Sequence, residues 1–270
     1  MNSIFNRKTL VIAVALLSLG AVITVANASH SWGGYHWGRT SNPFTLKLGN
    51  NTSGTWKNLL GTVSADWSKS TALDTSIVAG GTTARRCRPT LGRDEVCNYN
   101  YGNTGWLGVA QIWVYGDGHI AQGTVRNNDY YFGSSTYKYN NEAEKLHVIC
   151  QEIGHTLGLD HQSTDGSSLN TCMDYYYNTS GADTLSTKPN AHDYDELDNF
   201  IYAHLDSTNT VFATAFPKGN NVGNNVDVGT DDRSGWGKEI RKNSRGHNSL
   251  FERDFGGGNK VFTFVIWTQE

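Results

Sequence analysis

The sequence contains little charge and no long run of charge of one sign. Asp, Glu, Lys and Arg together make up 17% of the 270 residues, and the formal net charge is −3 at pH 7. Nucleic acids and acidic membrane surfaces attract long basic runs, and no such run occurs in this sequence. We therefore expect no nucleic-acid partner.

Long apolar runs are absent except for one near the start of the chain. Residues 9–26 are largely apolar, Arg7 and Lys8 precede them, and Ala26, Asn27 and Ala28 follow as a small-x-small site. These are the three parts of a secretory signal peptide, so we expect residues 1–28 to be removed. The result would be a secreted protein without stable membrane association. A retained membrane anchor is the alternative that the length of the run leaves open.

Cysteine is scarce as well. The four cysteines are Cys87, Cys97, Cys150 and Cys172. An even number of cysteines in an exported chain indicates disulfide bonds. Four cysteines can pair in three ways, and their spacing alone does not choose among them.

The pattern of apolar residues predicts a mixed α+β fold. We expect strands at 44–48, 76–80, 106–114 and 260–267, of which the second and third are buried, and an exposed edge strand within 116–132. Apolar residues at helical spacing predict helices at 55–70, 141–157 and 193–205. The expected core positions of the first and last helices are Trp56, Leu59, Leu60, Val63 and Trp67, and Leu197, Phe200, Ile201 and Leu205.

Composition and element order divide the chain into three parts. These are the signal peptide (1–28), a domain that contains all three expected helices (29–208) and a Gly- and Asn-rich C-terminal extension that ends in a strand (209–270). The role of the extension does not follow from its sequence.

The helix expected at 141–157 carries a metal-binding pattern. Gln151 and His155 are four residues apart and share one helix face, and Glu152 lies beside them. Gly158 suits a left-handed helix stop, after which the chain can turn and bring His161 back. Two ligands four residues apart on a helix, with a third from the next loop, suit one zinc ion.

The stretch "QEIGHTLGLDH", residues 151–161, resembles the signature of the metzincin zinc endopeptidases, His-Glu-x-x-His-x-x-Gly-x-x-His. It departs from that signature at Gln151, where the family has its first histidine. Met173 fits the methionine turn that follows the signature in that family. Tyr175 is similar to the tyrosine that reaches the zinc in astacins and serralysins. The resemblance spans about residues 40–207.

The resemblance implies a metzincin-like zincin domain, with a mixed twisted sheet, an active-site helix and a helical C-terminal subdomain. It implies a secreted zinc-dependent endopeptidase that cleaves a protein or peptide substrate. Gln151, His155 and His161 would bind Zn²⁺, Glu152 would be the general base toward a metal-activated water, and Tyr175 would assist. Because the family packs the zinc helix against the methionine turn, it also implies a Cys150–Cys172 disulfide, which leaves Cys87 to pair with Cys97.

Gln151 leaves the activity open. A neutral amide oxygen is a weaker zinc donor than imidazole. Gln151 is therefore either a weak zinc ligand or a residue that does not bind zinc beside two histidines that do. The remaining alternative is that Gln151 indicates a protein that has lost its hydrolytic activity. The rival hypothesis is therefore a secreted pseudoprotease that binds protein or peptide without cleavage. A third, weaker alternative is a glycan contact through the aromatic stretch 31–38. The substrate preference and the oligomeric state do not follow from the sequence.

Three further histidines are considered as replacement ligands. His147 lies two helical turns before His155, about 12 Å away along a helix, which is too far for both to bind one ion. His119 and His192 have no spacing that connects them with the helix. We expect none of the three to replace Gln151.

Overall fold

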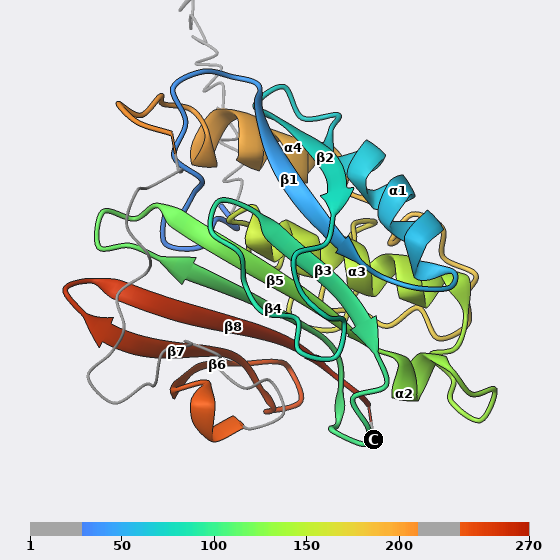
Figure 1. The fold of residues 1–270 in the computed structure, drawn as a ribbon. Helices are drawn as coiled ribbons and strands as arrows, with labels where there is room; N and C mark the ends of the chain where they lie inside the picture. Colours follow the sequence, from blue (N-terminus) through green and yellow to red (C-terminus); the bar gives the residue numbers. More distant parts are fainter. Residues whose placement is uncertain (1–28, 210–232, 270) are drawn as a thin grey trace, which may run out of the picture.

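The computed structural model describes residues 29–209 and 233–269, so the expected signal peptide lies outside the described residues. The described chain forms an eight-stranded sheet in the order β2-β1-β3-β5-β4-β8-β7-β6 (Figure 1). The strands are β1 (Phe44–Asn51), β2 (Leu73–Ala79), β3 (Asp94–Tyr99), β4 (Trp106–Val114), β5 (Ile120–Asn128), β6 (Lys238–Lys242), β7 (Asn248–Gly256) and β8 (Asn259–Trp267). Neighbours from β2 to β5 are parallel, and every pair from β5 to β6 is antiparallel.

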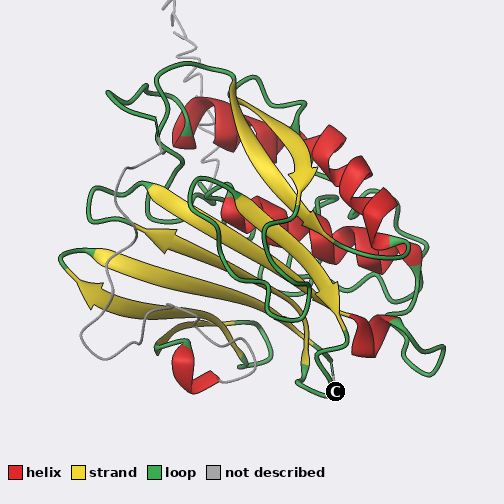
Figure 2. Ribbon diagram, in the orientation of Figure 1, coloured by secondary structure: helices red, strands yellow, loops and turns green. Residues whose placement is uncertain are grey.

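The described chain has four α-helices, which lie beside the sheet (Figure 2). They are α1 (Trp56–Trp67), α2 (Asp129–Phe132), α3 (Glu142–Thr156) and α4 (Ala191–Glu196), and α4 continues into a π-helical turn, η1 (Leu197–Ile201). A 3-10 turn, η2 (Arg233–Gly235), precedes β6. Helix α3 contacts α1, β4 and β5. The mixed α+β class that the sequence predicts is confirmed.

None of the helices within residues 29–209 and 233–269 has the length and apolarity that are needed to cross a bilayer.

Two apolar cores, one on each face of the sheet, bury β4. Leu107 and Ile112 belong to the core that includes residues of α1 and α3. Val109 and Trp113 belong to a second core, which also contains Trp236. Because both faces are covered, all residues of β4 are buried, as its continuous apolar run predicts.

The strand expected at an exposed edge is central instead. β5 lies between β3 and β4, and all its residues are buried. Its polar side chains have partners inside the protein: Arg126 donates to Gln111 Oε1 and to the Cys87 carbonyl oxygen, and Asn127 donates to the Cys97 carbonyl oxygen. The prediction of an edge strand is wrong because buried polar groups are stable when they are hydrogen-bonded.

Three expectations are wrong at the periphery. β2 is not a buried strand but the edge of the sheet, and Ile77 is 41% exposed. The last helix ends as α4 and η1 rather than continuing to residue 205, and its expected core residues Phe200 and Leu205 are 51% and 57% exposed. The π-turn has more than 3.6 residues per turn, so it rotates Phe200 away from the face that buries Leu197 and Ile201. The expected core residues of α1 are all buried.

Candidate functional site

Helix α3 carries the candidate site and has the boundaries that its sequence predicts. At its start the Asn141 side chain accepts a hydrogen bond from the Glu144 backbone N–H. At its end Gly158 has a φ of +100°, and a Cβ there would lie 2.3 Å from the Tyr35 carbonyl oxygen. Glycine is therefore required, and the turn that it makes brings His161 back to the helix.

His155 and His161 face each other through their Nε2 atoms, which are 3.2 Å apart. His155 Nδ1 donates to the Leu159 carbonyl oxygen at 2.9 Å, which leaves the Nε2 lone pair for a ligand or for His161. Burial lowers the pKa of both histidines, that of His161 to about 3. Both rings are therefore neutral at pH 7, which is the form that binds a metal ion.

Gln151 is fully buried one turn before His155. Its amide nitrogen donates to the Asp174 carbonyl oxygen at 2.6 Å. Its amide oxygen is buried and has no hydrogen-bond partner among the described residues. Such an atom is costly without a partner, and a metal ion is a partner that an amide oxygen can take. Asp174 thus orients Gln151 in a way that suits a ligand.

Glu152 packs against β4 and is fully buried. A Cβ on Gly108 of β4 would come within 2.6 Å of Glu152 Oε1, so only glycine leaves room for this carboxyl group. Burial raises the pKa of Glu152 well above its ordinary value, and the Ala110 backbone amide offsets part of this rise. The expected base is therefore held inside the protein, against the strand that borders the site.

The segment that follows His161 packs under α3. Cys150 of α3 is bridged to Cys172, with their Cα atoms 5.9 Å apart. The neighbouring Met173 lies where Gly154 leaves room, since a Cβ on Gly154 would be 2.3 Å from its sulfur. Cys87 and Cys97 are also bridged, with Cα atoms 6.0 Å apart. Both expected disulfides are confirmed.

Tyr175 lies between the histidines and the C-terminal strand. Its ring centroid is 5.1 Å from that of His161. Its hydroxyl donates to the Val265 carbonyl oxygen at 3.3 Å and accepts from the Trp267 backbone N–H at 3.0 Å. The residue expected to assist the metal is therefore bonded to the backbone of β8.

Strand β8 covers the histidine pair. It runs antiparallel to β4 along the whole of that strand. Phe264 of β8 stacks on the His155 ring, with centroids 4.1 Å apart and an angle of 12° between the rings. The apolar sequence of residues 260–267 predicts this strand, but no signal in it identifies β4 as the partner.

Strand β6 reaches the same region through Arg241. Its guanidinium pairs with the carboxylate of Asp160, which directly precedes His161. The guanidinium also lies 4.9 Å from the centre of a Trp32 ring. Trp32 in turn packs edge-on against Phe262 of β8. Of the other aromatic residues in 31–38, Trp37 is buried and donates to the Thr156 carbonyl oxygen, so much of this stretch packs into the protein.

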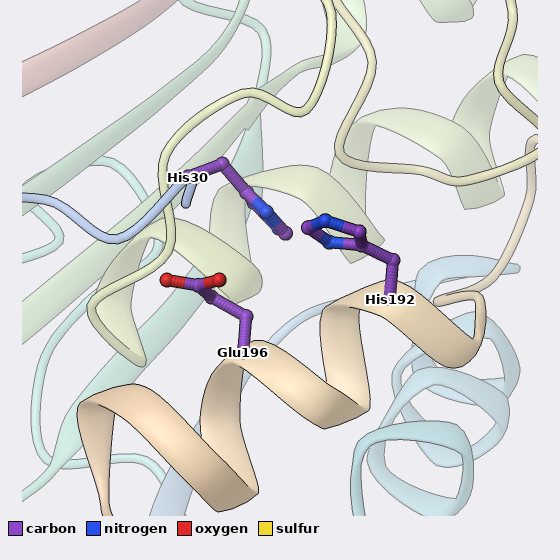
Figure 3. A group of neighbouring side chains, drawn as sticks. All are labelled: His30, His192 and Glu196. Carbon is purple, nitrogen blue, oxygen red and sulfur yellow. The ribbon is translucent and has the colours of Figure 1, made fainter. Parts of the chain in front are cut away.

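His147 and His192 have other neighbours. His147 is buried and its Nδ1 donates to the Ser186 carbonyl oxygen at 2.7 Å. His192 and Glu196 lie on adjacent turns of α4 and point toward His30 of the N-terminal segment (Figure 3). The ligand atoms of these three side chains lie within 4.8 Å of one another.

Two members of the group formed by His30, His192 and Glu196 already have partners within the protein. His30 Nε2 lies 3.0 Å from Asp193 Oδ1, and Glu196 Oε1 accepts from Ser29 Oγ at 2.5 Å. This group ties the start of the described chain to α4.

Comparison with known protein families finds no matching family model, and comparison with curated proteins finds no match. The chemistry of the site therefore has to be inferred from its own residues.

Proposed function

We propose that this chain is a secreted zinc-dependent endopeptidase of metzincin type, whose own C-terminal strand covers the site in the described conformation. One observation carries the proposal. β8, an extended piece of polypeptide, pairs with β4 and lays Phe264 on His155 and its backbone on the Tyr175 hydroxyl. Addition of a strand to a sheet edge is a common way to bind a peptide, so an extended peptide substrate suits this position.

Zinc would be held by Gln151 Oε1, His155 Nε2 and His161 Nε2. Two features support the fit: the two imidazole nitrogens are 3.2 Å apart, and the Gln151 oxygen is buried without a hydrogen-bond partner among the described residues. When bound, zinc would supply Lewis acidity, which polarises a peptide carbonyl and lowers the pKa of a water molecule.

The remaining steps belong to side chains of this protein. Glu152, next to Gln151 on α3, would take the proton of the attacking water and deliver it to the departing amine. Tyr175 would donate to the carbonyl oxygen of the substrate, as its hydroxyl now donates to Val265. The edge of β4 that pairs with β8 would hold the substrate backbone. Because β8 occupies that edge, it has to leave before a substrate can bind.

A second function is favoured by the burial of the site. Glu152, His155 and His161 are all buried. Gln151 would be a weak zinc ligand, which a protein without hydrolytic activity tolerates. On this alternative the protein is a pseudoprotease that binds a protein or peptide at the β4 edge, in exchange for β8, without cleavage.

The decisive experiment measures zinc content and cleavage together. Purified mature protein is analysed for bound zinc and incubated with casein, with and without a chelator. Chelator-sensitive cleavage supports the endopeptidase. Zinc binding that depends on His155, without cleavage in any variant described below, supports the pseudoprotease. If His155→Ala leaves both zinc content and cleavage unchanged, neither proposal survives.

We expect Phe264→Leu to raise the rate of casein cleavage. The change keeps an apolar side chain in the core but removes the ring that stacks on His155. An aromatic pair of this kind contributes about 0.5–1.5 kcal/mol beyond its buried area. If the covered conformation alone loses this stabilisation free energy, the fraction of molecules in which β8 has left the site increases. The cleavage rate should then increase about 2- to 10-fold.

Phe262→Leu is the matched control. Phe262 is two residues earlier on the same strand and is buried like Phe264, but its ring packs against Trp32 and Tyr35. The two variants should lose similar thermal stability, whereas the increase in rate should be larger for Phe264→Leu. Equal rates in both variants would show that the His155 stack does not hold the site closed.

A further inference from the structure

A second group of histidines converges on one carboxylate oxygen. His36 Nε2, His119 Nε2 and His204 Nε2 lie 3.4, 3.4 and 3.3 Å from Asp206 Oδ1. The ligand atoms of His36, His204 and Asp206 also lie within 4.8 Å of one another. His119 is outside this set and is placed beside it by its distance to Asp206 Oδ1. These residues come from the N-terminal segment, from the turn between β4 and β5, and from the chain after η1.

The distances from the three ring nitrogens to Asp206 Oδ1 are those expected between ligands of one zinc ion. Four ligands at about 2.0–2.1 Å in a tetrahedron lie about 3.3–3.4 Å from one another. The three nitrogen-to-oxygen distances have this value. Hydrogen bonds explain the arrangement less well, because three ring nitrogens approach a single oxygen whose lone pairs number two.

The tautomer of His36 also favours a cation between its ring and Asp206. Its Nδ1 lies 2.8 Å from the Gly34 carbonyl oxygen, which can only accept, so Nδ1 carries the proton. In the neutral ring the lone pair of Nε2 then faces the carboxylate of Asp206. Two acceptors at 3.4 Å repel each other unless a proton or a metal ion lies between them.

Neighbouring groups hold Asp206 in place and adjoin His119. His119 Nδ1 lies 3.1 Å from Asp117 Oδ2, so a carboxylate adjoins the ring nitrogen that does not face Asp206. The other oxygen of Asp206, Oδ2, accepts from the backbone N–H and from Nη1 of the buried Arg39, both at 3.1 Å. Asp206 is therefore fixed with Oδ1 turned to the histidines.

We propose that His36, His119, His204 and Asp206 bind a zinc ion at a second site, separate from the candidate site on α3. Four protein ligands leave no open position, so the ion has a structural role. It joins three segments that are far apart in the sequence. His204 is the most exposed of the four, with 56% of its side chain accessible, and gives the ion its route of entry.

The second site adjoins the end of α3 through the backbone. Trp37, next to His36, donates to the Thr156 carbonyl oxygen at 2.8 Å, and the Tyr202 hydroxyl donates to the Leu157 carbonyl oxygen at 2.9 Å. An ion that holds His36 and His204 in place would also hold these two neighbours against the turn at Gly158. We therefore expect it to contribute to thermal stability.

His204→Ala tests the site with the mature protein. The exposed side chain can be removed without opening a cavity. We expect the variant to lose one zinc ion per chain after dialysis, or to bind that ion at least about 100-fold more weakly. Loss of a group that only hydrogen-bonds to a metal ligand already lowers metal affinity about 10- to 100-fold. Cobalt(II) added to zinc-free protein should give a tetrahedral absorption band that is weaker in the variant. A chelator should lower the melting temperature of the variant less than that of the wild type.

Two comparison variants separate this site from the one on α3. His247→Ala removes an exposed histidine outside both groups and should leave zinc content and chelator sensitivity unchanged. His155→Ala should leave the zinc that depends on His204 in place, whether or not the proposed endopeptidase is active. Equal zinc content and affinity in His204→Ala and wild type would overturn the second site. So would a wild type whose zinc is lost completely in His155→Ala.

Discussion

Glu152→Gln is expected to abolish cleavage of casein while zinc stays bound. The change removes the carboxylate that would accept the proton but leaves Gln151, His155 and His161 in place. Loss of a general base lowers rates by about 10²- to 10⁴-fold. The variant should be measured both in the wild-type chain and together with Phe264→Leu, so that a low basal rate does not conceal the loss. Zinc content is measured on the same samples.

Glu144→Gln is the matched control for this experiment. Glu144 is a buried glutamate on the same helix, and its Oε2 accepts from the backbone N–H of Asn178, remote from the ligand positions. Burial raises the pKa of Glu144 to about 8, so its side chain is largely neutral at pH 7 and tolerates an amide. We expect full cleavage in this variant. If Glu152→Gln cleaves casein as fast as Glu144→Gln, another group transfers the proton and the role given to Glu152 is wrong.

Gln151→His is expected to tighten zinc binding at the α3 site by at least about tenfold, since imidazole is a better zinc donor than an amide oxygen. The new ring would occupy the space of a buried side chain on the face that carries His155. Zinc affinity is measured by competition with a chromogenic chelator. The measurement is made in the His204→Ala chain, so that the proposed second site does not contribute.

Gln151→Ala gives the opposite change and serves as the comparison. It removes the oxygen and the hydrogen bond to the Asp174 carbonyl, so zinc affinity should fall below that of the wild type. The order of affinity should be His, then Gln, then Ala at position 151. Identical affinities in all three would mean that residue 151 does not face the metal. A faster cleavage rate in Gln151→His would further show that weak metal binding limits the natural chain.

Local sequence determined helix α3 and the spacing of the candidate site residues along it. Asn141 caps α3, Gly158 ends it, and the four-residue interval from Gln151 to His155 places both on one face. These features depend on residues within a few positions of one another, so the sequence is sufficient to predict them. The same holds for β4. Its sequence is an almost unbroken run of apolar residues, which predicts a strand that is buried on both faces.

Polar strands were harder to predict. No strand was expected at β3, and β5 was expected at an edge, although both lie inside the sheet. Asp94 and Glu95 of β3 are buried because Thr156 and Thr90 donate hydrogen bonds to them. Whether a polar residue is buried depends on partners from distant segments, and a window of sequence does not contain those partners.

Tertiary structure alone decided what surrounds the candidate site. The apolar run of residues 260–267 specifies a strand, but strand pairing depends on which sheet edge is free, so β8 on β4 was not predictable. His36 and Asp206 are 170 residues apart in the sequence. The intervals between His36, His119, His204 and Asp206 match no short motif that would predict their meeting. The sequence by itself determined one helix and the spacing of the proposed ligands on it. The fold decided that β8 covers that helix and that His36, His119, His204 and Asp206 meet, because both outcomes arise from contacts between segments that the chain brings together only when it folds.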